Sequence, residues 1–144
     1  MRIILFFLLS FIASTNTEAQ KSYYPDGYYF PNTEIKKGNW NFEWMGIMIE
    51  PVKDFKNFVS ARFRNLKTDK WIVIQTKKYR IKRDSTSITF NNKLTGELII
   101  SGHFTHHKVP YDDKSVTSKT IVFVSSYKSD NKTIPVSFTW GEGD

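Results

Sequence analysis

The stretch IPVSFTW, residues 134–140, alternates apolar and small polar side chains along most of its length. Its apolar residues, from Ile134 to Trp140, fall on even positions, and Ser137 and Thr139 separate the last three. Successive side chains of a β-strand point to opposite faces, so this period of two predicts a half-buried strand. Pro135 has no N–H to donate to a ladder, which places it at a sheet edge or on an open side of the strand.

The same period occurs near the start of the chain. Trp40, Phe42 and Trp44 occupy even positions, but the apolar pattern resumes on odd positions at Ile47. One extra residue in a strand shifts the phase in this way, and glycine is often found where that happens. We therefore expect a β-bulge near Gly46.

Composition supports strands over helices throughout the chain. Beyond residue 19 the only alanine is Ala61, and the only leucines are Leu66, Leu94 and Leu98. Alanine and leucine favour helices, whereas the Ile, Val, Thr and aromatic residues used here favour strands. Further strand patterns or short apolar runs cover residues 59–63, 71–74, 88–90, 98–104 and 121–124, and the run at 71–74 could continue, bent, to residue 81.

Short turns separate these segments, and parallel strands would need long crossovers. The sequence therefore predicts an all-β fold, an antiparallel meander of seven to eight strands. Such a meander closes into a small barrel, our first expectation, or alternatively folds as a two-layer β-sandwich.

The chain has 144 residues, which fits one folded domain. Residues 1–19 are typical of a secretory signal peptide, with Arg2 before an apolar run over 3–13 and a small residue, Ala19, at the cleavage site. That run is well short of the roughly 20 residues of a membrane span, and no second apolar run follows, so we expect no transmembrane span. The expected parts are a signal peptide (1–19), a Tyr-rich N-terminal arm (20–37) and a single β domain (38–144).

The chain contains no cysteine. This excludes cysteine nucleophiles, thiolate metal sites and disulfides. Together with cleavage after Ala19, it predicts a secreted or periplasmic bacterial protein that is stable through its core alone.

Gly38-Asn39-Trp40 resembles the G-x-W motif at the start of the first strand in lipocalin-like proteins. The resemblance implies a ligand-holding barrel with Trp40 at its closed end, and a small apolar ligand held near Trp40, Phe42 and Trp44. Most aromatic residues should nevertheless be core, because buried aromatics are the ordinary content of such a domain. Lipocalins usually stack a basic residue near the last strand on this tryptophan, often an arginine, and this chain has no arginine after Arg83.

The formal charge of +7 is concentrated in part in KKYRIKR, residues 77–83, which carries five cationic side chains. On a strand, Lys78, Arg80 and Lys82 share one face. Arg62 and Arg64 alternate in the same way on the preceding strand pattern, so all five cations would share one surface if the two segments were neighbours. This surface is either a binding site for an anionic glycan or another polyanion, or an ordinary solvated face. An exported protein rarely meets nucleic acid, so we expect no nucleic-acid partner.

All three histidines lie close together, at His103, His106 and His107. On an extended strand His103 and His107 would lie about 13 Å apart, too far to share one ion. A site that joins His106 or His107 to Asp112 or Asp113 is the remaining arrangement, and no known ligand spacing matches it. We expect no metal site and no cofactor.

No motif of a hydrolase, metalloprotease or phosphate-binding loop occurs in the sequence, and no residue is assigned a catalytic role. The sequence therefore predicts a non-catalytic, exported binding protein for a small apolar ligand. The alternative is an envelope or extracellular interaction module that binds an anionic glycan through its basic face. The oligomeric state stays open.

Overall fold

The computed structural model describes residues 26–49, 58–106, 114–129 and 131–141, and these residues form ten strands without a helix. Their bounds are β1 Gly27–Pro31, β2 Ile35–Lys37, β3 Trp40–Met48, β4 Phe58–Asn65, β5 Trp71–Thr76, β6 Tyr79–Lys82, β7 Ser85–Asn92, β8 Gly96–Phe104, β9 Ile121–Ser129 and β10 Lys132–Gly141. Every pairing between them is antiparallel.

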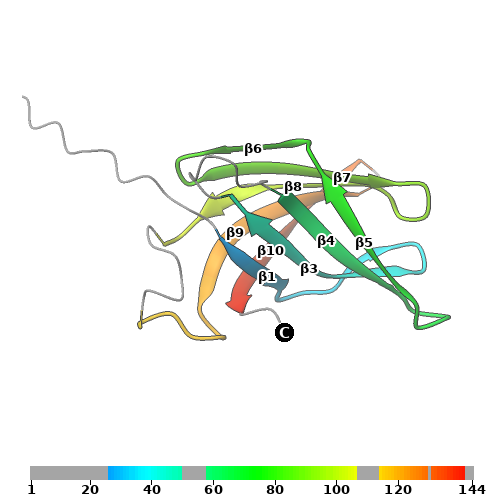
Figure 1. The fold of residues 1–144 in the computed structure, drawn as a ribbon, viewed down its shortest axis with the longest axis horizontal. Helices are drawn as coiled ribbons and strands as arrows, with labels where there is room; N and C mark the ends of the chain where they lie inside the picture. The colour runs from blue at the N-terminus through cyan, green and yellow to red at the C-terminus, as the bar shows by residue number, and fades with distance from the viewer. Residues whose placement is uncertain (1–25, 50–57, 107–113, 130, 142–144) are drawn as a thin grey trace, which may run out of the picture.

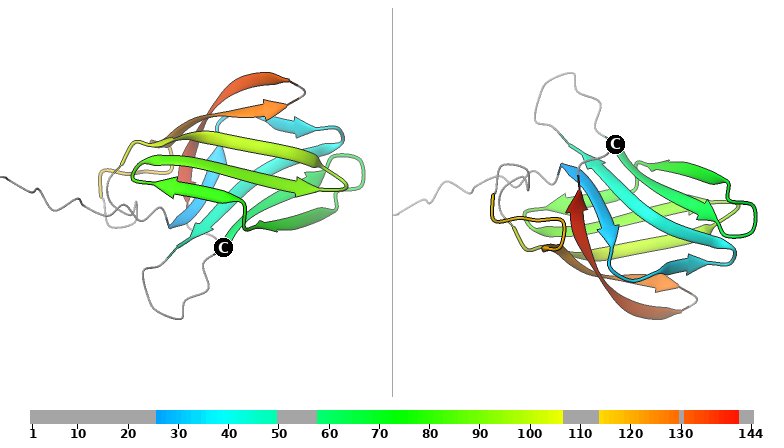
Figure 2. Two further views of the ribbon diagram at one scale, coloured as in Figure 1. Left: turned by 90° about the horizontal axis from the view of Figure 1, so that it is seen from above. Right: turned by 90° about the horizontal axis from the view of Figure 1, so that it is seen from below.

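The strands form one sheet that curls into a nearly closed barrel (Figures 1 and 2). Its order is β5-β4-β3-β1-β10-β9-β8-β7-β6, and β2 pairs with β3 outside this path. From β3 to β10 the chain is a meander, because most successive strands are hydrogen-bonded neighbours. The predicted all-β antiparallel fold and its barrel form are confirmed, with ten strands in place of seven or eight.

The barrel comes close to closing because the two halves of one bent stretch of chain, β5 and β6, form the two ends of the sheet. β5 pairs with β4 and ends at Thr76, and β6 begins at Tyr79 and pairs with β7. The two strands are the expected bent continuation of the apolar run at 71–74, interrupted at Lys77 and Lys78. Counting the two halves separately is one reason for the higher number of strands.

The other reason is β1 and β2, which come from the segment that we set apart as an arm. β1 pairs with β10 on one side and with β3 on the other, and Tyr29 at its centre is fully buried. A strand that buries such a ring inside the barrel is part of the fold, so the β domain of the structure begins upstream of Gly38. The expected signal peptide, residues 1–19, lies outside the described residues.

Aromatic side chains fill the interior in a connected series. Phe42 contacts Phe63, Phe90 and Phe138, with ring centroids 5.4, 6.4 and 6.1 Å apart. Phe138 in turn contacts Phe123 at 5.5 Å. These five rings are essentially buried, so the side chains of opposite walls meet inside the barrel.

The extra residue in β3 lies earlier than we predicted. The register against β4 shifts between Phe42 and Trp44, so the bulge is at Glu43 and not near Gly46. Phe42 and Met45 both face the core, while Glu43 and Trp44 between them stay partly exposed. The phase shift was visible in the sequence, but glycine was a misleading sign of its position.

Pro135 lies in β10 where that strand has one neighbour. It is opposite Ser126 of β9, whereas the pairing of β10 with β1 covers only Phe138–Gly141. The strand is therefore interior to the sheet, and its open side at Pro135 matches the second of the two placements that we expected.

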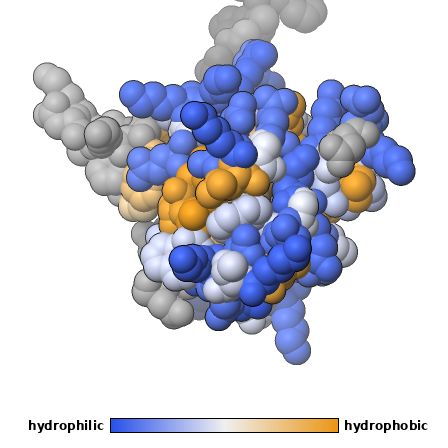
Figure 3. All heavy atoms as spheres, turned by 90° about the vertical axis from the view of Figure 1, so that its right-hand side faces the viewer, coloured by the Kyte–Doolittle hydropathy of each residue, from blue (hydrophilic) through white to orange (hydrophobic). Residues whose placement is uncertain are grey.

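A few large apolar side chains stay exposed on the barrel. Figure 3 looks onto the end that carries the β4–β5 and β7–β8 turns, and shows apolar side chains gathered between charged ones. The most exposed are Leu94 in the β7–β8 turn and Trp71 at the start of β5.

Candidate functional site: a basic groove on the outer face

The basic run forms the outer face of β6. Arg80 and Lys82 are exposed, whereas Tyr79 and Ile81, which alternate with them, are half-buried against the core. Lys78 just before the strand is also exposed. The structure thus brings Arg80 and Lys82 to one side of the sheet, as the alternation of the sequence predicts, while Lys78 lies outside the strand and does not line the groove described next.

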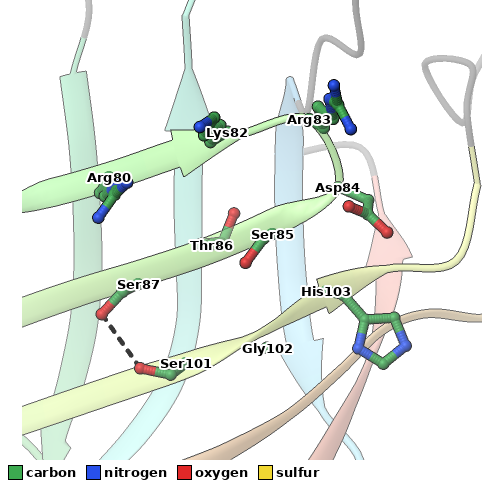
Figure 4. A pocket seen from close by; sticks show the side chains of 10 residues that line it. All are labelled: Arg80, Lys82, Arg83, Asp84, Ser85, Thr86, Ser87, Ser101, Gly102 and His103. Atoms are coloured by element: carbon green, nitrogen blue, oxygen red, sulfur yellow. Dashed lines mark hydrogen bonds between the residues drawn. The ribbon is translucent and has the colours of Figure 1, made fainter.

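An open groove of about 830 Å³ lies on the outer side of β6, β7 and β8 (Figure 4). Three strands contribute to it, together with the turn between β6 and β7. Its lining residues are Arg80, Lys82, Arg83, Asp84, Ser85, Thr86, Ser87, Ser101, Gly102 and His103.

Strand register arranges these side chains in rows across the sheet. Arg80 is opposite Ser87, which is opposite Ser101, and the two serine Oγ atoms lie 3.1 Å apart. Lys82 is opposite Ser85, which is opposite His103. Each row therefore begins with a cation on β6, continues through a serine on β7 and ends in Ser101 or His103 on β8.

Two cations of the groove, Arg80 and Lys82, carry little compensating charge among the described residues. Within the described residues, neither Arg80 nor Lys82 forms an ion pair, and Asp84 is the one carboxylate that lines the groove. Arg80 and Lys82, two cations without an ion pair among the described residues, therefore lie beside one carboxylate and give the groove a positive balance.

Arg62 and Arg64 lie elsewhere and are already engaged. Arg62 Nε lies 2.8 Å from Glu43 Oε2, and its guanidinium carbon lies 5.1 Å from the centroid of the Trp71 ring. Arg64 Nε lies 3.5 Å from Glu43 Oε1 and 3.5 Å from Asp69 Oδ1. Opposite charge within these distances neutralises both arginines in part.

The five cations do not line one groove. Arg62 and Arg64 are on β4, which pairs with β3 and β5, while β6 pairs with β7. The bend at Lys77 and Lys78 takes the chain away from β4 before the basic strand begins. The condition for a shared surface, that the two segments be neighbours, is therefore not met.

Arg83 adopts a backbone conformation that is unusual for arginine. Lys82 pairs with Ser85, so Arg83 and Asp84 form a two-residue turn, and Arg83 has a φ of 58°. Elsewhere in the described part of the chain, the non-glycine residues with positive φ are Asp69 and Asn131. Asp and Asn tolerate the left-handed region, whereas for most residues it costs about 1–2 kcal/mol. Strain of this kind often occurs at functional sites.

The three aromatic residues expected at a ligand site do not line one space. Phe42 is buried in the core, and Trp40 is half-buried against it. Trp44 is on the outer side, where its ring contacts Tyr28 edge-on at 5.0 Å, and it lines a hollow of about 490 Å³ that Phe42 also lines but Trp40 does not. The bulge at Glu43 causes this division, because it turns Trp44 away from the face that Phe42 occupies.

The histidines are also divided. His103 is exposed and lines the groove, while His106 lies beyond β8 with its Nδ1 2.8 Å from Thr105 Oγ1. His107 and the two acidic residues considered with it, Asp112 and Asp113, are outside the described residues. Among the residues that the structure describes, no three His, Asp or Glu side chains are grouped as metal ligands would be.

Sequence reasoning missed the part of the groove that comes from β7 and β8. Ser85 and Ser87 alternate with buried residues on one strand, as Ser101 and His103 do on the other. This alternation could have been recognised in the sequence as the outer face of two strands. Which outer faces adjoin β6 became evident only with the strand register.

A scan against protein-family models found no match, and searches of curated proteins and of solved structures found none either. What the structure establishes is the class of fold, a nearly closed antiparallel β-barrel. No helix among the described residues is long and apolar enough to cross a membrane.

Proposed function

We propose that this protein is a non-catalytic binding module for anionic polysaccharide, and that the groove on β6, β7 and β8 is its binding surface. The observation that carries the proposal is the pair of cations Arg80 and Lys82, which form no ion pair among the described residues and lie in one groove with a single lining carboxylate. Such a surface attracts anions and raises their local concentration.

The neighbouring hydroxyl groups favour a glycan over other anions. Ser85, Ser87 and Ser101 each offer one donor and two acceptor positions, which suits the hydroxyl groups of a sugar. Arg80 and Lys82 are two residues apart on a strand, so their Cα atoms lie about 7 Å apart. A polymer with repeated carboxylate or sulfate groups can therefore meet both cations.

The expected export of the chain agrees with a glycan of the cell envelope or its surroundings. A signal peptide over residues 1–19, with release to the periplasm or the medium, is part of this proposal. The function needs neither metal nor cofactor, because charge and hydroxyl groups alone hold the ligand.

An apolar ligand inside the barrel stays a prediction, and the interior geometry argues for the outer face instead. Phe42 on β3 and Phe90 on β7 extend from different walls and are 6.4 Å apart between ring centroids. A ligand in this region would have to displace packed rings. The lipocalin-like resemblance would predict uptake of an apolar fluorophore, which titration with such a dye measures directly.

The glycan proposal is tested by retention on an immobilised carboxylated polysaccharide such as polygalacturonate, eluted with a salt gradient. We expect binding that weakens steeply with salt, since screening acts on exposed charges. The double variant Arg80→Gln/Lys82→Gln should elute at clearly lower salt than the parent protein. Neutral dextran should retain neither protein.

The matched control is Lys67→Gln/Lys93→Gln, which removes the same charge from two exposed turns away from the groove. If the proposal is right, this variant elutes close to the parent. Equal loss of retention in both double variants would mean that binding follows net charge alone, and would contradict a specific groove.

A further inference from the structure

The sheet of the nearly closed barrel has one free edge that is unusual in its composition. β5 pairs with β4 along one side, and the path through the sheet ends at β5. Along its other side the described residues provide no strand that pairs with Trp71–Thr76.

The hydrogen-bonding phase shows which backbone groups face this edge. Asn65 N–H donates to the carbonyl oxygen of Lys70 at 2.7 Å, at the start of the β4–β5 pairing. Because antiparallel residues alternate between bonded and non-bonded pairs, Ile72 and Ile74 direct their N–H and C=O groups to β4. The groups of Trp71, Val73 and Gln75 are then directed outward from the sheet.

The edge begins where the two halves of the bent strand separate. Thr76 Oγ1 donates to the carbonyl oxygen of Thr89 at 2.7 Å, and Thr89 N–H donates to that of Lys78 at 2.9 Å. These bonds join the bent strand to β7. β7 thus lies close to the Thr76 end of β5, and the unpaired part of the edge lies toward Trp71.

The side chains of this edge lack the usual protection against pairing. The sequence of β5 is WIVIQT, without a charge, a proline or a glycine. Trp71 is 59% exposed and Val73 is 46% exposed. Native edges are normally guarded by charged residues, prolines or bulges within the strand, so an uncharged edge of this kind is suited to accept another strand.

The charges that flank β5 indicate what kind of strand fits. Lys70 precedes it, Lys77 and Lys78 follow it, and all three are exposed. An antiparallel second copy of this chain would bring Lys70 of each copy beside the Lys77–Lys78 end of the other. Like charges at such positions are destabilising. Carboxylates at both ends of an incoming strand would instead meet lysines.

We propose that the free edge of β5 is a strand-addition site for an extended segment of another protein, apolar in its middle and acidic at its ends. Backbone bonds to Trp71, Val73 and Gln75 would supply the affinity, and the flanking lysines would select the charge. This site is separate from the glycan groove, and neither proposal depends on the other.

Amide hydrogen exchange of the full chain tests the proposal, with a synthetic peptide as the probe. In this peptide threonine and valine alternate between paired glutamates, and the control peptide carries lysines in place of the glutamates. We expect the amides of Trp71, Val73 and Gln75 to exchange fast in the free protein and slowly with the acidic peptide. No protection with the acidic peptide at millimolar concentration, or equal protection with both peptides, would overturn the proposal.

Two variants separate edge pairing from a loss of folding. Val73→Pro removes one outward N–H and should weaken peptide binding about tenfold, the value of one or two hydrogen bonds. Lys70→Glu/Lys77→Glu leaves the backbone intact and should reverse the preference toward the lysine peptide. A dimer in sedimentation that Val73→Pro abolishes would assign the edge to a second copy and so contradict the proposal. Polysaccharide retention of Val73→Pro should stay unchanged.

Discussion

At the scale of single residues, the groove depends on the difference between engaged and available cations. Arg62 forms an ion pair with Glu43, and its guanidinium lies over the ring of Trp71. Its charge is therefore engaged by side chains of β3 and β5. Arg80 has the same side chain but no ion pair among the described residues. The residue type alone does not define the binding surface, because each local partner decides whether a charge is available to a ligand.

Arg83 gives a prediction at this scale. Arg83→Gly removes the Cβ that makes a φ of 58° costly, so the free energy of unfolding should rise by about 1 kcal/mol in chemical denaturation. The same substitution should weaken retention on polygalacturonate, since one cation of the groove is lost. Asn131→Gly is the control, with a smaller change in stability because asparagine tolerates its φ of 64°. A lower stability of Arg83→Gly would show that the side chain supports the turn more than the backbone strains it.

The exposure of individual side chains could largely be predicted from the alternation of the sequence. The exposure of Arg80 and Lys82, and the burial of the residues that alternate with them, could be deduced from period two. The left-handed conformation of Arg83 could not, because arginine shows no preference for it. The separation of Phe42 from Trp44 was likewise hidden, since one bulged residue reverses the side to which later side chains point.

At the scale of elements, the bend between β5 and β6 builds the site. It separates the chain from β4 and directs Arg80 and Lys82 to the side of β7 and β8, whose outer residues are small. The sequence indicated a bent strand, but it did not show that the first half pairs with β4 and the second half with β7. The condition for a surface shared by Arg62 and Arg80, that their strands be neighbours, is not met for this reason.

The pairing of β8 with β9 gives a prediction at this scale. A Cβ added at Gly102 would lie 2.2 Å from the carbonyl oxygen of Val124 and 2.5 Å from the Cα of Ser125, so the backbone of β9 would have to move. Overpacking of this kind typically costs about 1–3 kcal/mol, which thermal unfolding of Gly102→Ala should show. Gly46→Ala is the comparison, with a smaller loss, because the nearest atoms to its Cβ are side-chain atoms 3.2 Å away. Equal stability of Gly102→Ala and the parent would contradict the close approach of the two strands.

At the scale of the whole molecule, the barrel depends on a strand from the start of the chain. β1 lies between β3 and β10, so the two ends of the meander meet through it. The tyrosine-rich composition of this segment led to the expectation of an arm. Its place in the barrel could not be deduced from one short strand pattern, because one of its two partners, β10, is at the other end of the described chain.

Tyr29 supplies the prediction for this scale. Its ring is fully buried and contacts Phe104 and Phe123 at 5.5 and 6.3 Å between centroids. Tyr29→Ala should lower the free energy of unfolding by about 3–5 kcal/mol, as other large aromatic truncations in cores do. Tyr28→Ala, at a half-buried neighbouring position, should cost less. A small effect of Tyr29→Ala would mean that the barrel is complete without β1.

The central claim, that the outer groove and not the interior is the binding surface, is tested most directly by mapping amide chemical shifts during titration with an oligogalacturonate. The account predicts shifts confined to the outer face of β6, β7 and β8, around Arg80, Lys82, Ser87 and Ser101, which disappear at high salt. Shifts centred on interior residues such as Phe42 and Phe90, or no shifts at all, would contradict it.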